Sequence, residues 1–426
     1  MKKKKLDGLD LTVFEEKLDN GLNVYIVPME HVKGIYATLS VDFGGDKETF
    51  IPIDGKKMVK MPRGIAHFIE HQLFNQKDGS DIFAYYSERG TSCNANTRNN
   101  KTTYLFSGVN FLEDNINKLL DFVFEPYFTD ESVSKEKGII EEEIRMYDDD
   151  PYAQILYHSY ANVFKEHPLK APLIGTKESI NKISKEDLYT TYKTFYQPSN
   201  MYLIVTGNID PKNVIEIVKE NQKNKKFSKP HKIVTATYNE PDKVVKRKEV
   251  LSMKVSVPKV AISFKININK IKNIKKHEIL SYLTFIFDTK LGPTSLFLEN
   301  LKKDNVIIDN FYMSYIETDM HVLYLVQAET EKPQELTDKV LKEMQDLNIT
   351  EQDLERRRRV LLSYQILASE NIYQVNLKLM NNISKYGCIL YDAFLDIKNM
   401  NMKQFKYVIK NISLENYSVL TVEAKK

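Results

Sequence analysis

The chain has 426 residues, which is too many for a single hydrophobic core and predicts at least two domains. Its 61 basic and 58 acidic residues leave a net charge of +3, which is too small to indicate a surface for nucleic acid or membranes. No apolar stretch approaches the ~18 residues of a transmembrane helix, and the basic residues 1–5 lack the apolar segment of a signal peptide behind them.

The first half of the chain begins with strand patterns and continues with helical ones. An Asn-Gly turn between apolar segments at 17–28 is a strong hairpin signal, and another strand is predicted at 36–43. Helical periodicity then predicts helices at 65–74, 110–124, 132–147 and 185–195, followed by a strand at 201–206.

The second half repeats this order of elements. It opens with strand-like segments at 255–257 and 260–264 and closes with a helix at 403–410 and a strand at 416–422. We therefore expect an α+β fold of two homologous, duplicated domains, each a mostly antiparallel β-sheet packed with α-helices. A segment rich in Lys, Asn and Pro separates the halves. The expected division is an N-terminal domain 1–220 that carries the metal motif, a linker 221–249, and a similar C-terminal domain 250–426 without it.

The most informative segment is the predicted helix that carries His67, Glu70 and His71. Residues four apart share one face of a helix, so the two imidazoles can bind one divalent metal, and Glu70 lies beside them. The order His-x-x-Glu-His is the reverse of the His-Glu-x-x-His helix of zinc proteases. Two incidental histidines on a solvated helix face are the alternative interpretation.

A third ligand is predicted on the helix at 132–147. Glu143 lies one turn after Ile139 and Ile140, on the apolar face, and a buried carboxylate is costly unless it is paired or bound to a metal. Glu136 shares that face two turns earlier and could hydrogen-bond a ligating His to orient it. Glu141, in contrast, has basic neighbours and suits a solvated surface.

Several motifs together resemble one family, the pitrilysin or insulinase-type zinc metallopeptidases, which include the mitochondrial processing peptidase. The resemblance covers most of residues 15–215, whereas the second half matches in size and pattern only. It is carried by residues 63–74, 93–97, 136–143, 167–168, 174–180 and 195–201. It implies two duplicated α+β domains per chain, which pair so that four domains enclose a chamber.

The resemblance also implies an activity. A family member would be a zinc endopeptidase for peptides or unfolded polypeptide, in which His67, His71 and Glu143 bind Zn²⁺, Glu70 is the general base, and Glu136 supports the site. The family's substrate lies beside the strand around Asn94, Ala95 and Asn96 and pairs with it as an added strand. Without the resemblance, residues 94–97 are interpreted as an ordinary polar turn near a strand.

One departure from the family concerns the second half. Members that complete their own site carry an Arg and a Tyr there, in a pattern like Leu-Arg-x-x-x-Gly-Leu-Ala-Tyr, which stabilise the oxyanion and bind substrate. Lys302 stands here at the Arg position, and the Tyr position falls on Ile308 or Asp309. A Lys lacks the forked donors of Arg.

The expected partners follow from that departure. The chain is expected to form either a homodimer or a heterodimer with a metal-less paralogue that supplies the Arg and Tyr. A catalytically silent scaffold or peptide-binding subunit of the same family is the alternative function.

The presence of only two cysteines, Cys93 and Cys388, favours a reducing compartment and predicts a cytoplasmic protein. No nucleic-acid or membrane partner is expected.

Overall fold

A computed structural model describes residues 1–223, 225–228, 230–308 and 310–425. The chain divides into two compact units, and each is assembled from three separate segments. The first unit comprises Met1–Ile144, Pro172–Thr237 and Tyr364–Phe394, and the second comprises Arg145–Ala171, Tyr238–Ser363 and Leu395–Lys426.

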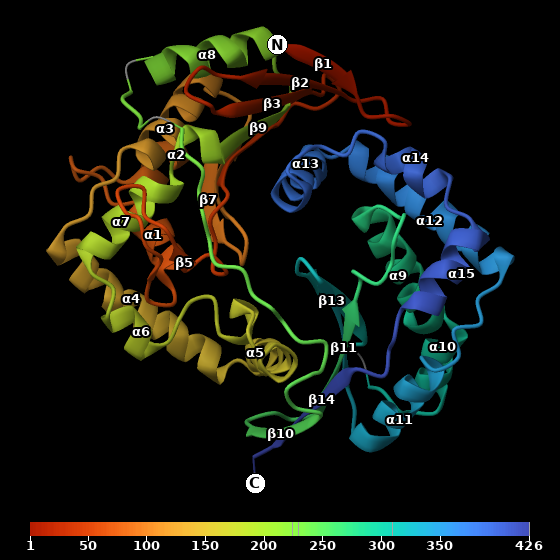
Figure 1. Cartoon of the computed structure of the whole chain (residues 1–426). Helices are drawn as coiled ribbons and strands as arrows, with labels where there is room; N and C mark the ends of the chain where they lie inside the picture. The colour runs from red at the N-terminus through yellow and green to blue at the C-terminus, as the bar shows by residue number, and fades with distance from the viewer. Residues whose placement is uncertain (224, 229, 309, 426) are drawn as a thin grey trace. The chain divides into compact units, whose positions relative to one another are not determined.

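The first unit is built on a seven-stranded sheet of order β1-β2-β3-β9-β4-β8-β7 (Figure 1). All neighbouring strands are antiparallel except β3 and β9. The hairpin predicted at 17–28 is confirmed, with Gly21 at φ +94° in the turn between β2 and β3. The strands are β1 (Lys2–Lys5), β2 (Thr12–Lys17), β3 (Asn23–Pro28), β4 (Ile35–Val41), β7 (Ser92–Thr97), β8 (Thr102–Gly108) and β9 (Met201–Gly207), and a separate ribbon pairs β5 (Thr49–Phe50) with β6 (Val59–Lys60).

Helices cover both faces of this sheet. Successive side chains of β8 point to opposite faces of the sheet. Tyr104 packs against Phe122 of α3 on one face, and its neighbour Thr103 contacts Met380 of α13 on the other. The helices are α1 (Ile65–Gln72), α2 (Ile82–Ser87), α3 (Leu112–Phe124), α4 (Asp130–Asp149), α6 (Lys177–Asn181), α7 (Lys185–Phe195), α8 (Pro211–Lys223) and α13 (Ile372–Tyr386), with a short 3₁₀ helix η2 (Pro198–Asn200). The four helices predicted in this half are confirmed within a few residues.

The second unit repeats the sheet pattern with five strands in the order β10-β14-β11-β13-β12. Only β10 and β14 are parallel, so this order reproduces β3-β9-β4-β8-β7 of the first unit strand by strand. The strands are β10 (Lys248–Met253), β11 (Lys259–Asn267), β12 (Tyr312–Glu317), β13 (His321–Glu329) and β14 (Tyr417–Ala424). The expected α+β fold of two similar, mostly antiparallel sheets packed with helices is confirmed.

Helices α9, α10, α11 and α15 contribute to the core of the second unit. The elements are α5 (Pro151–Val163), η1 (Pro168–Lys170), α9 (Lys276–Leu291), α10 (Leu296–Lys303), α11 (Pro333–Glu343), α12 (Glu351–Ser369), α14 (Ala393–Lys398) and α15 (Met402–Asn411). The helix and strand predicted near the C-terminus are confirmed. The strand predicted at 255–257 is wrong, because the chain bends there between β10 and β11.

The two halves of the chain exchange a helix. α5 comes from the first half but packs on β14 and β11, whereas α13 comes from the second half and packs on β9 and β4, the equivalent strands of the other sheet (Figure 1). Part of the expected linker is also structured, because Ile51 and Ala236 form backbone hydrogen bonds that pair residues 234–236 with β5. The boundaries 1–220, 221–249 and 250–426 describe homologous domains, whereas the two compact units are defined by contacts within the folded chain. The boundaries therefore stay a prediction.

Candidate metal centre

The short helix α1 presents the His-x-x-Glu-His motif on a scaffold that fixes its start. Gly64 precedes it at φ +93°, and a Cβ there would lie 2.4 Å from the carbonyl oxygen of Ile174. This position needs a positive φ and has no room for a Cβ atom, and only glycine meets both requirements. Within the helix, Phe68 and Ile69 are fully buried, so packing of these apolar side chains sets the direction in which the polar ones point.

The second helix of the site is α4, which carries Glu136 and Glu143 two turns apart. Ile140, between them, is fully buried and anchors this face of α4. Ile139, which the sequence argument placed on the same apolar face, is 47% exposed, so that part of the argument was wrong. The buried face of α4 is defined by Glu136 and Ile140 instead.

The structure brings His67, His71 and Glu143 together. The Nε2 atoms of both imidazoles lie 3.7 Å from the same oxygen, Oε2 of Glu143, and the ring centroids are 4.4 Å apart. All three ligand atoms lie within 4.8 Å of one another. Ligands at bonding distance from a tetrahedral zinc lie roughly 3.3–3.6 Å apart, so this cluster of two nitrogens and one carboxylate oxygen fits zinc with little adjustment.

Glu136 contacts one of the candidate ligands, His71. Its Oε1 is 2.8 Å from Nδ1 of His71, so Nδ1–H donates to the carboxylate and Nε2 is left to face Glu143. Gln72, fully buried next to His71, donates to Oε2 of Glu136 at 3.5 Å and accepts a hydrogen bond from the Ser132 hydroxyl at 2.8 Å. The sequence predicted the contact of Glu136 but not that of Gln72, because an amide side chain is not a typical metal ligand.

The protonation of the cluster follows from burial and neighbouring charge. Burial, together with the adjacent His71, lowers the pKa of His67 to about 3, which keeps this ring neutral. For His71, burial acts to lower the pKa, but the hydrogen bond that its ring donates to Glu136 and the nearby carboxylates outweigh it and raise the pKa. Nδ1 of His67 is buried and has no hydrogen-bond partner among the described residues.

Glu70 lies beside the ligands and is held by a residue that the motif does not contain. Glu70 is only 8% exposed, and burial raises its pKa. The hydroxyl of Thr97 donates to Oε2 of Glu70 at 2.6 Å. Thr97 ends β7, the strand expected to lie beside substrate. Its hydroxyl was missed because Thr has no distinctive spacing relative to the His motif.

Asn94, Ala95 and Asn96 belong to β7, which forms an outer edge of the sheet. The backbone N–H of Ala95 donates to Oδ1 of Asn94 at 2.8 Å and so takes no part in the pairing with β8. Oδ1 of Asn96 is buried and has no partner in the described part of the chain. β7 therefore has an unpaired edge, at the end of which Thr97 contacts Glu70.

The positions at which family members carry the Arg and the Tyr belong here to the second unit. Lys302 is exposed near the end of α10, and Ile308 is 56% exposed. Asp309 lies outside the described residues. On β12, Tyr312 donates to Oε1 of Gln327, and Tyr315 stacks on Tyr324.

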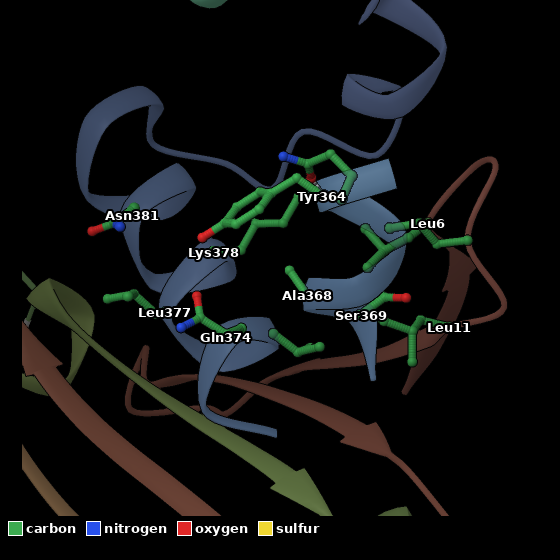
Figure 2. Close-up of a pocket in the computed structure, with 12 residues that line it drawn as sticks. Leu6, Leu11, Tyr364, Ala368, Ser369, Gln374, Leu377, Lys378 and Asn381 are labelled. Carbon is green, nitrogen blue, oxygen red and sulfur yellow. Dashed lines mark hydrogen bonds between the residues drawn. The ribbon is translucent and has the colours of Figure 1, made fainter. Parts of the chain in front are cut away.

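A separate cavity of about 130 Å³ lies in the first unit, away from the residues of the metal cluster (Figure 2). Leu6 and Leu11 line one side, and Ala368 and Lys378 are among the residues that line it from α12 and α13. Lys378 donates to Oε1 of Gln365 at 2.6 Å, and burial lowers its pKa to about 8. None of the three candidate ligands lines this cavity.

Comparison with known proteins identifies the family. The family model described as Insulinase (Peptidase family M16) matches residues 60–177, and the model described as Peptidase M16 inactive domain matches residues 182–361. The uncharacterized zinc protease YmfH of Bacillus subtilis is 36% identical over 336 residues, which cover 78% of each chain. The chain belongs to the M16 peptidase family.

Solved structures agree with this M16 assignment. A chain described as an M16-like peptidase from Alicyclobacillus acidocaldarius superposes with a TM-score of 0.92 at 27% identity, over 98% of this chain and 100% of that one. A protease from Helicobacter pylori shares the fold, with a TM-score of 0.83 at 18% identity, over 96% of this chain and 99% of that one. In the described part of this M16 chain, no helix is both long and apolar enough to cross a bilayer.

Proposed function

We propose that this M16 chain is a zinc endopeptidase that hydrolyses peptides or unfolded polypeptide, with Zn²⁺ held by His67, His71 and Glu143. One observation carries the proposal: two imidazole nitrogens and a carboxylate oxygen converge within 4.8 Å beside the buried carboxylate of Glu70. A catalytically silent scaffold needs neither the three candidate metal ligands nor a buried carboxylate beside them. Catalytic zinc sites have three protein ligands of these types and leave one position open, which matches the cluster.

Bound zinc supplies Lewis acidity, which polarises the scissile carbonyl and makes water a nucleophile near neutral pH. Glu70 is the general base that takes the proton from the attacking water and later delivers it to the leaving amine. Glu136 holds Nδ1 of His71, which keeps Nε2 directed at Glu143. No Ser or Cys nucleophile is required.

The substrate is proposed to bind as an extended strand on β7, with Asn94, Ala95 and Asn96 beside its backbone. The two edges of the seven-stranded sheet support this. β1, at one edge, consists of four exposed lysines, a feature that discourages pairing with another chain. β7, at the other edge, has no charged residue and leaves the N–H of Ala95 out of the β8 ladder. Binding through the backbone suits many sequences.

The chain is further proposed to act as part of a dimer whose four domains enclose a chamber. Lys302, in place of the family's Arg, favours a heterodimer in which a metal-less paralogue supplies the Arg and Tyr, and a homodimer is the alternative. The cytoplasmic location inferred from the two cysteines is part of the same proposal.

The experiment that tests the function compares the wild-type chain with Glu70→Gln on a pool of unstructured peptides, analysed by mass spectrometry. Each protein is assayed alone and with a co-purified paralogue. The wild type should cleave in at least one of the two settings, and Glu70→Gln should keep its zinc but lose turnover by about 10²–10⁴-fold. Wild-type rates from Glu70→Gln would contradict the mechanism. A wild type that binds zinc and peptides but cleaves in neither setting would support the scaffold function instead.

A further inference from the structure

The hydroxyl of Thr97 is placed to decide which oxygen of Glu70 acts as the base. Thr97 Oγ1 lies 2.6 Å from Oε2 of Glu70, and Glu70 is only 8% exposed. An ionised carboxylate has no proton to give, so Thr97 is the donor in this contact. Among the residues that the structure describes, no side chain donates to Oε1 of Glu70, and the backbone N–H of Thr97 is a further donor to this carboxylate.

The neighbouring hydroxyl does not compete for that proton. Thr102, directly opposite Thr97 in the β7–β8 ladder, lies 3.4 Å away, oxygen to oxygen. The Thr102 hydroxyl donates to the backbone carbonyl of Phe43 at 2.9 Å, so its single proton is already used. The Thr102 oxygen could still accept a proton, so distance and charge decide: Oε2 of Glu70 is charged and lies 2.6 Å from Thr97 Oγ1, against 3.4 Å for the Thr102 oxygen. The Thr97 proton is therefore directed at Glu70, and a hydrogen bond to a charged acceptor is among the stronger ones in proteins.

We propose that Thr97 is a positioning residue that holds Oε2 of Glu70, so that Oε1 is the oxygen that exchanges the proton during hydrolysis. This inference rests on the proposed function. Oε1 takes one proton from the attacking water, whose oxygen bonds to the scissile carbonyl carbon. When the C–N bond breaks, Oε1 passes that proton to the amine nitrogen, and the second water proton leaves with the new carboxyl group.

Because Thr97 lies on β7, its contact with Glu70 also connects the general base to the strand proposed to bind substrate. Thr97 is the last residue of β7, and Asn94 to Asn96 precede it on the same strand. The strand proposed to bind the substrate backbone therefore also holds the general base. A substrate paired with β7 is placed in a fixed register relative to Oε1, and such alignment of the reacting groups lowers the barrier to reaction.

The test uses Thr97→Val, which keeps the shape and strand preference of Thr but removes the hydroxyl, and Thr97→Ser, which restores it. Thr97→Val should lower kcat by about 10- to 100-fold, as expected for loss of one hydrogen bond to a charged group, with KM and zinc affinity unchanged. Thr97→Ser should recover most of kcat. Thr102→Val is the matched control, since it removes the neighbouring hydroxyl without touching Glu70, and its kcat should stay close to wild type.

A double variant separates positioning from a general structural effect. In the Glu70→Gln background, Thr97→Val should have little further effect on the residual rate, because the two residues act as a unit. Equal losses of kcat from Thr97→Val and Thr102→Val, a raised KM, or loss of zinc in Thr97→Val would overturn the inference. So would wild-type kcat in a folded Thr97→Val chain. If the wild type itself has no peptidase activity, the proposed function fails and this inference fails with it.

Discussion

Glu136 and His71 form a hydrogen bond, 2.8 Å from Oε1 to Nδ1, that links helix α4 to helix α1 behind the metal cluster. Helix α4 thus carries both a candidate ligand, Glu143, and the carboxylate that contacts a candidate ligand on helix α1. The positions of the three candidate ligand atoms therefore depend on how α1 and α4 pack together as well as on the ligand residues themselves.

Glu136→Gln should weaken zinc binding without removing it. Partners of this kind typically contribute about 10- to 100-fold in metal affinity, because they fix the tautomer and orientation of the ligating imidazole. Competition with a chromophoric chelator measures the change. Glu141→Gln is the control on the same helix: Glu141 pairs with Lys177 at 3.3 Å, and its loss should leave zinc affinity unchanged. Equal affinities for Glu136→Gln and wild type would contradict the role of Glu136.

Ala95→Pro should impair substrate binding more than folding. The N–H that proline removes donates to the Asn94 side chain and not to β8, so the ladder loses no bond, whereas an added strand loses a donor. We expect KM for peptides to rise several-fold, as for the loss of about 1 kcal/mol from one hydrogen bond, with zinc content unchanged. Ala95→Ser keeps the N–H and should bind peptides as the wild type does. An unchanged KM in Ala95→Pro would rule out pairing at this residue.

Leu379→Ala tests whether α13 is integral to the first unit. Leu379 is fully buried on α13, in a cluster with Val13, Val27 and Ile204 of the first sheet. Its truncation should lower the free energy of unfolding by about 2–5 kcal/mol, measured by denaturant titration. Leu367→Ala is the control, because Leu367 is 70% exposed, and its effect should stay within about 0.5 kcal/mol. Similar small decreases in the free energy of unfolding for Leu379→Ala and Leu367→Ala would show that α13 packs loosely.

Asp46→Asn should stabilise the protein at neutral pH. Burial raises the pKa of Asp46 to about 7 from an ordinary 3.8, and its Oδ1 lacks a hydrogen-bond partner among the described residues. The folded state thus holds a proton that the unfolded state releases, so stability falls as pH rises from about 4 to 7. Melting temperatures measured from pH 4 to 8 should show an advantage for Asp46→Asn at pH 7 to 8 that vanishes near pH 4. A gain independent of pH would exclude ionisation of Asp46 as its cause.

The sequence predicted the local elements well because their signals are local. The helices bearing His67 and Glu143 were found from periodicity. The candidate ligands were predicted from the spacing of the two His residues and from the position of Glu143 on an apolar helix face. The exchange of α5 and α13 was not predicted, because an amphipathic face shows that a helix packs without showing on which sheet. Thr97 and Gln72 were missed for a related reason: they reach the site through tertiary contacts, and hydroxyls and amides occur everywhere in the chain.

The most direct test of the central claim is the zinc content of the purified chain, measured by elemental analysis beside Glu143→Gln. This measurement requires no substrate and no partner. We predict about one zinc per wild-type chain and a large loss in the variant, because a three-ligand site cannot spare its only carboxylate. A wild-type chain that takes up no zinc, or a Glu143→Gln chain that keeps it in full, would contradict the assignment of His67, His71 and Glu143 as the metal centre.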